Sequence, residues 1–198
     1  MDVTDETWAM DLPEPGDESV DPALAAAVLE VEAHVAQEGW DRASRLFALV
    51  PTAALVAAEP DLAHAMGLDE SSAEGSFTPV EQEVDPAQPI EELLATLMWP
   101  AGVAGCAVTV ERLVLPPGAD AGLPDDPLAA QEYAAAHPER QDVRIVAGAT
   151  RAGARYCALR LRSHDDDQSV VGSTDLVPEL LELLHATFEG DDEEERRP

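Results

Sequence analysis

Three stretches repeat apolar side chains at helical spacing. The first, 22–38, follows a capping Asp21, starts with proline and ends at Gly39, and the second covers 90–98. The third, 173–188, contains Pro178, which a helix tolerates only in its first turn. Because positions i, i+3, i+4 and i+7 share one face of a helix, these stretches predict three amphipathic helices.

The spacing of apolar and polar residues predicts four strands. They cover 77–84, whose Pro79 favours a sheet edge, 104–115 with an irregularity near Arg112, 141–150 and 154–163. The last two flank a short connection that contains Gly153, so they predict a β-hairpin. Within it Val143, Ile145 and Ala147 should face inward opposite Cys157, Leu159 and Leu161.

Two further segments predict short helices. Residues 41–68 contain prolines at 51 and 60 that would divide the segment into two or three helices, and 128–136 follow a loop rich in Pro, Gly and Asp. The whole pattern predicts one α+β domain over 21–188, with a mostly antiparallel sheet of about four strands and helices packed on one face. The acidic ends, 1–20 and 189–198, lack any apolar period and are expected to be disordered.

The charge of the chain excludes several classes of partner. The 198 residues carry a formal net charge of -30, and all 11 cations are arginine. Phosphate groups and anionic membranes need clustered cations, so we expect no binding to nucleic acid or membrane. The charge-free run 93–110 reads as helix, turn and strand rather than a membrane span, and the acidic N-terminus fits no targeting signal, so we expect a cytoplasmic protein.

The residue pattern gives little support for a catalytic site or a metal site. Cys106 follows two glycines but enters a strand, whereas a nucleophile elbow needs strand, turn and helix. The run His164–Asp167 lacks the remaining positions of a calcium loop. The sequence therefore predicts no catalytic residue, no metal and no cofactor. An enzyme with a cryptic thiol or carboxylate site stays open as the alternative.

Seven of the eleven arginines lie between 104 and 163. Strand alternation places Arg144, Tyr156, Arg160 and Arg162 on the side of the hairpin opposite Cys157, so we predict that they form a partner-binding face. The alternative is that these arginines pair with the surplus of Asp and Glu within the chain.

Several stretches resemble an uncharacterised family of small acidic proteins from actinobacteria. They are GWDRASRLFALVPT, EPDLAHAMGL, WPAGVAGCAVTVERLVLPP and AAAHPERQDVRIVAG, and the resemblance covers roughly 21–188. It implies no activity, cofactor or catalytic residue that could be placed on this chain. The expected function is a non-catalytic, cytosolic protein-binding or adaptor-like module, similar in outline to small chaperones, with a protein partner or a second copy of itself.

Overall fold

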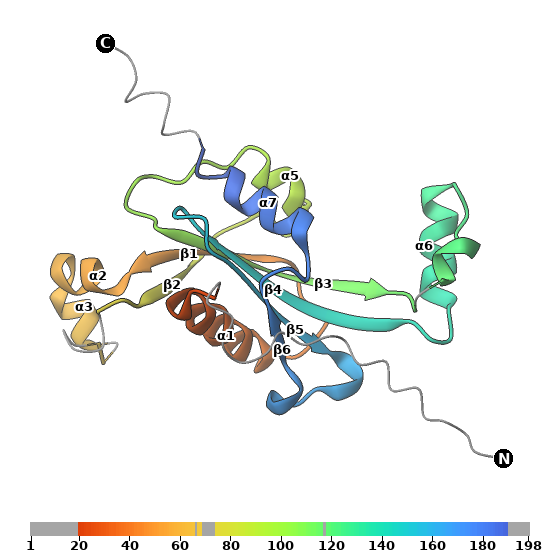
Figure 1. Cartoon of the computed structure of the whole chain (residues 1–198), viewed down its shortest axis with the longest axis horizontal. Coiled ribbons are helices and arrows are strands. Elements are labelled where there is room, and N and C mark those ends of the chain that lie inside the picture. The colour runs from red at the N-terminus through yellow and green to blue at the C-terminus, as the bar shows by residue number, and fades with distance from the viewer. Residues whose placement is uncertain (1–19, 66, 69–73, 117, 190–198) are drawn as a thin grey trace, which may run out of the picture.

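The computed structural model describes residues 20–65, 67–68, 74–116 and 118–189, as an α+β domain (Figure 1). The acidic ends expected to be disordered lie outside the described residues, apart from Val20 and Glu189.

The centre of the domain is one antiparallel sheet of six strands, where the sequence pattern predicts about four. The strand order is β2-β1-β3-β4-β5-β6, and every neighbouring pair is antiparallel. The strands are β1 (Arg45–Pro51), β2 (Phe77–Gln82), β3 (Gly105–Val114), β4 (Gln141–Thr150), β5 (Arg155–Leu161) and β6 (Val171–Ser173).

The two additional strands are β1 and β6. Strand β1 lies where the sequence pattern predicts a helix. Its apolar residues are buried on both faces of the sheet, so they do not alternate with polar residues as those of a half-exposed strand do. Leu46 packs in one core cluster and Phe47 in the other. Strand β6 is only three residues long, too short for a period to be visible.

The predicted hairpin is confirmed in its register. Ala147 lies opposite Cys157, Ile145 opposite Leu159 and Val143 opposite Leu161. Strand β3 pairs with β4 in one unbroken register from Gly105 to Val114, so the irregularity expected near Arg112 is absent. Strand β2 forms the sheet edge that its proline predicts.

Helices pack on both faces of the sheet, which corrects the expectation of one covered face (Figure 1). Helix α1 (Pro22–Ala36) covers one face, while α5 (Ile90–Leu94) and α7 (Pro178–Ala186) cover the other. Helices α2 (Thr52–Ala58) and α3 (Pro60–Ala65) follow β1, and α6 (Pro127–Ala136) lies between β3 and β4 in the chain. Strand alternation divides the core into two clusters, one beneath each set of helices.

Helix α1 begins directly after its N-cap residue, Asp21. The Oδ1 atom of Asp21 accepts hydrogen bonds from the backbone N–H groups of Ala23 at 2.9 Å and Leu24 at 3.1 Å, and Pro22 occupies the first turn. The buried side of α1 meets β4 where Gly148 has no side chain, so helix and strand approach closely.

Strands β3 and β4 extend beyond their neighbours. Strand β1 pairs with β3 only as far as Thr109, and β5 pairs with β4 only as far as Val143. The β3–β4 pair is therefore two-stranded at its outer end, where Leu113 and Val114 lie opposite Asp142 and Gln141. Helix α6 stands beyond this end, apart from both layers of helices (Figure 1). We call residues 111–116 and 118–142 the arm.

None of the helices in the described part of the chain has the length and apolar character that crossing a membrane requires.

The close approach at Gly148 predicts a specific sensitivity. A Cβ atom there would lie 2.6 Å from Val28 Cγ2 and 3.2 Å from Leu24 Cδ1, so Gly148→Ala should lower the free energy of unfolding by about 1–3 kcal/mol. Gly102→Ala is the matched control, because a Cβ at Gly102 meets nothing within 4 Å. Urea unfolding measures both variants, and equal stability for the two would contradict this packing of α1.

Candidate functional site

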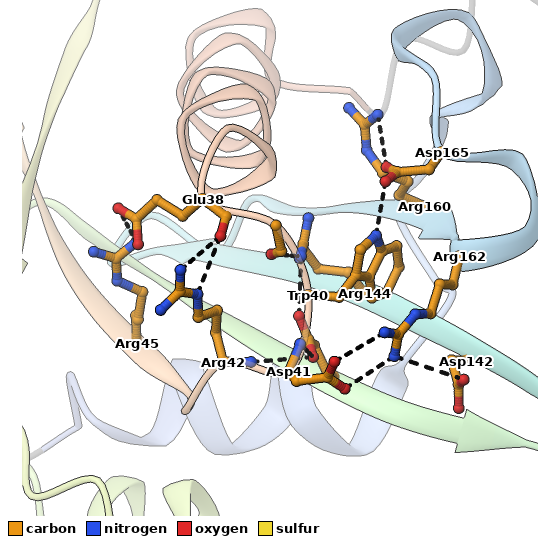
Figure 2. A network of polar contacts seen from close by, with 12 residues as sticks. Glu38, Trp40, Asp41, Arg42, Arg45, Asp142, Arg144, Arg160, Arg162 and Asp165 are labelled. Carbon is orange, nitrogen blue, oxygen red and sulfur yellow. Dashed lines mark hydrogen bonds and ion pairs between the residues drawn. The ribbon is translucent and has the colours of Figure 1, made fainter.

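The turn between α1 and β1 is organised around Trp40 (Figure 2). Its ring lies 4.3 Å from the guanidinium carbon of Arg144 and 5.6 Å from that of Arg162. The indole N–H donates to Asp165 at 2.8 Å. Cations over the face of a tryptophan ring are attracted by its quadrupole, so the ring ties the turn to the hairpin.

Two carboxylates fix the same turn to the sheet. Arg162 donates two hydrogen bonds to Asp41, at 2.9 and 2.8 Å, and this pairing lowers the pKa of the Asp41 carboxyl. Glu111 of β3 accepts from the backbone N–H of Asp41 at 2.8 Å and from Arg144 at 2.9 Å, and Arg144 also donates to the Gly39 carbonyl. Asp41 adopts a positive φ of 64°, which these contacts hold in place.

A buried, bidentate polar contact joins α1 to β5. Arg160 donates two hydrogen bonds to Glu32, at 2.6 and 2.8 Å, and both side chains are only 3% exposed. Arg160 also donates to Asp167 at 2.9 Å. The bond to Glu32 raises the pKa of Arg160 above its ordinary value, so the guanidinium stays charged. Glu32 and Arg160 form the Glu32–Arg160 pair, which lies beneath α1.

Arg144, Tyr156 and Arg160 come from one side of the hairpin, as their alternation predicts, but α1 covers that side. Arg162 lies beyond the end of β5, in the short 3-10 helix Arg162–His164, which corrects its expected place in the strand. Arg144 is 1% exposed and Arg160 2%, and Tyr156 is partly buried against the α1 cluster. Arg162 keeps 42% of its side-chain exposure. Arg144, Arg160 and Arg162 all pair with acidic residues of the chain, which is the arrangement that the alternative interpretation describes (Figure 2). Partner binding by these four residues stays a prediction.

Both thiols lie in the core beneath α5 and α7. Burial raises the pKa of Cys106 to about 12 and that of Cys157 to about 11. The Cys106 sulfur lies 3.8 Å from the Leu184 carbonyl oxygen and 3.8 Å from the Thr187 hydroxyl. Thiolates are the nucleophilic form of cysteine, so this surrounding disfavours attack on a substrate.

The acidic run that follows β5 has local partners. Asp165 and Asp167 accept from Arg160, while Asp166 accepts from the Ser169 hydroxyl at 2.7 Å and the backbone N–H of Gln168 at 3.0 Å. Within the part of the chain that the structure describes, no group of three or more His, Cys, Asp or Glu residues could hold a metal ion. The carboxylates of Asp165–Asp167 thus stabilise a local turn and pair with the buried Arg160.

Exposed apolar side chains gather on the arm. Of the seven large hydrophobic residues exposed among those described, the arm carries four, namely Leu113, Val114, Leu123 and Leu128. The most exposed is Leu128, at 66%, which lies in the first turn of α6. No residue of this ten-residue helix is buried. Large apolar side chains exposed on one part of a protein are candidates for contact with another protein.

Two hollows lie where the arm leaves the sheet, and Arg112 and Glu91 line both. These two side chains form an ion pair between β3 and α5. The first hollow, of about 320 Å³, is bordered by residues 42–44 and 84–91, together with Leu93 and Glu111. The second, of about 360 Å³, is lined mainly by apolar side chains of the sheet and α7, namely Val110, Ile145, Val177, Pro178, Leu180 and Leu183.

The sequence pattern did not identify the arm as a surface. The sequence feature that could have indicated the arm is the segment PLAAQEYAAA. It contains a single large aliphatic residue, Leu128, and therefore has no apolar stripe with which to pack on a sheet. The unequal lengths of β1, β3 and β5 that leave the outer end of the β3–β4 pair two-stranded follow from pairing between distant strands, which local alternation does not determine.

Comparison with known proteins identifies the family of the chain. The family model described as PPA1309-like protein matches residues 24–189, so the chain belongs to the PPA1309-like family. This confirms the expected membership of an uncharacterised family, over nearly the range that the resemblance covers. No curated protein and no solved structure matches the chain.

The Glu32–Arg160 pair should be essential for stability. Arg160→Ala leaves Glu32 as an unpaired buried charge, so the free energy of unfolding should fall by about 3–5 kcal/mol. Arg162→Ala removes an exposed ion pair just beyond the end of β5, so the free energy of unfolding should fall far less than in Arg160→Ala. Urea unfolding at neutral pH compares the two, and a similar loss in both variants would contradict the buried role of Arg160.

The two thiols should be unreactive in the folded protein. At pH 8 both pKa values lie far above the solution pH, so iodoacetamide should label neither Cys106 nor Cys157 until urea unfolds the chain. Mass spectrometry of the intact protein counts the labels. Rapid labelling of either cysteine without denaturant would favour the enzyme alternative.

Proposed function

We propose that the protein is a non-catalytic, cytoplasmic protein-binding module that docks a basic partner through the arm. The observation that carries this proposal is α6, a ten-residue helix that buries none of its residues and stands beyond the end of the β3–β4 pair, where exposed apolar side chains lie. Helices of this length are marginal in water when they lack packing. A partner that packs on α6 would supply the contact surface that the domain does not.

The apolar side chains of the arm leave surface that a partner would cover. Full burial of a leucine or valine contributes roughly 1.5–3 kcal/mol, and the four side chains of the arm, which are 37% to 66% exposed, would each contribute part of that. Interfaces of this kind derive most of their affinity from a few central apolar side chains surrounded by polar residues. Leu128 has the largest exposed fraction of the four and is therefore the first candidate for such a role.

The charge of the arm favours a basic partner. Residues 111–142 contain seven acidic side chains and two arginines, within a chain of net charge -30. An acidic surface attracts a basic partner and repels a second copy of the same chain, and this attraction weakens as salt increases. These charges favour a basic protein over the homodimer.

The arm can be tested by capture from the native cytoplasm. The wild-type chain should retain a basic protein that Leu128→Asp loses by at least about tenfold, because the substitution places a charge at the apolar centre of the contact. Met98→Asp is the matched control, since Met98 is 61% exposed and lies outside the arm. Quantitative mass spectrometry measures recovery, with elution by added salt as a second readout.

Two results would contradict the proposal. One is an identical set of retained proteins for wild type and Leu128→Asp. The other is an equal loss in Leu128→Asp and Met98→Asp, because the contact would then not be specific to the arm.

A further inference from the structure

One edge of β3 is free along the arm. Strand β1 pairs with β3 from Gly105 to Thr109, while the pairing of β3 with β4 continues to Val114. The chain before β1, residues 42–44, lies near Glu111 without strand pairing. Among the described residues no strand lies beside Val110–Val114 on the β1 side. The last five residues of β3 thus have a paired edge and an open one.

The register identifies the backbone groups on the open edge. The N–H of Arg151 donates to the Ala104 carbonyl at 2.8 Å, directly before the paired stretch of β3 and β4. In an antiparallel pair alternate residues exchange hydrogen bonds, so even-numbered residues of β3 bond to β4. The odd-numbered Glu111 and Leu113 therefore direct their N–H and C=O groups toward the open edge.

The polar hollow of about 320 Å³ lies where this edge begins. Glu111 and Arg112 line it from β3, and residues 42–44 line it from the chain that leaves α1. Asp41 and Arg42 bond through their backbone N–H groups to the Glu111 carboxylate rather than to its backbone. The side chain of Glu111 is thereby held toward the turn. Its backbone carbonyl accepts a hydrogen bond from the exposed Arg112 side chain at 3.4 Å, which an added strand has to replace.

We propose that the open edge of β3 at Glu111 and Leu113 accepts an extended segment of a basic partner protein as an added strand. This inference rests on the proposed function, because it specifies how the arm would bind its partner. Main-chain hydrogen bonds to an exposed strand edge supply affinity, and side chains of the added strand supply specificity. The hollow gives room for side chains at the start of the edge.

Charge selects the basic segment over a second copy of this chain. Glu111 is already paired with Arg144, so the acidic charge near this edge comes from the other acidic residues of the arm. Two copies paired here would bring these residues together, and like charges across paired strands are destabilising. An extended segment with alternating basic and apolar residues avoids this repulsion. Its apolar residues could lie beside Leu113 or Val114, which are 37% and 45% exposed.

The probe is a nine-residue peptide of alternating arginine and valine, acetylated and amidated, with a fluorescent label. It should bind the full-length protein in an anisotropy titration. The same peptide with every backbone nitrogen methylated keeps its charges but cannot donate N–H groups, so it should bind at least about tenfold more weakly. Equal binding of the two peptides would show a purely electrostatic contact and overturn the inference.

A variant of the protein tests the same strand pairing by removing a hydrogen-bond donor from β3 rather than from the peptide. Leu113→Pro removes an N–H that faces the open edge and leaves the pairing with β4 intact, because proline is tolerated at such positions. It should weaken peptide binding about tenfold, whereas Leu113→Ala, which keeps the N–H, should weaken it by less than about threefold. Circular dichroism and thermal unfolding check that both variants fold as the wild type does.

The outcomes separate this inference from the proposed function. Equal binding of the peptide to wild type and Leu113→Pro, absence of binding, or dimerisation of the chain through this edge would each overturn the added strand. The proposed function depends instead on the native partner lost by Leu128→Asp. If that partner is lost by Leu128→Asp but kept by Leu113→Pro, the arm binds through α6 and the strand edge is not used.

Discussion

The Glu32–Arg160 pair is the interaction on which the arrangement of the domain depends. Two side chains that are each 3% exposed form a bidentate contact between α1 and β5. Removal of either partner would leave a charge in a largely apolar layer, so α1 has to lie over this face of the sheet. Trp40 and Asp41 then connect the end of α1 to the hairpin and β3.

The burial of Arg160 in this pair changes how the seven arginines between residues 104 and 163 are interpreted. In an acidic chain with few cations, clustered arginines suggest a surface for acidic partners. Here Arg144 and Arg160 serve as internal counter-ions for Glu111 and Glu32, and they are buried. One face of the sheet lies under α1 and the other under α5 and α7, while the arm extends beyond both layers and is the surface that we propose for a partner.

Local sequence patterns predicted the elements that lie at the boundary between core and solvent. The cap of α1, the edge position of β2 and the register of the hairpin all follow from periodicity, proline and glycine. Strand β1 was missed because it is buried on both faces. The burial of Arg160 was missed because its partner, Glu32, is 128 residues away in the sequence, and no local pattern connects them.

The most direct test of this arrangement is native-state hydrogen exchange measured residue by residue. The account predicts that the amides of α1 and those of β3, β4 and β5 in the sheet exchange only through global unfolding, with the same free energy, while α6 exchanges far faster. Exchange of α1 at a much lower free energy than the sheet would contradict the anchoring role of the Glu32–Arg160 pair. Protection of α6 equal to that of the core would contradict the proposal that α6 is a weakly packed docking element.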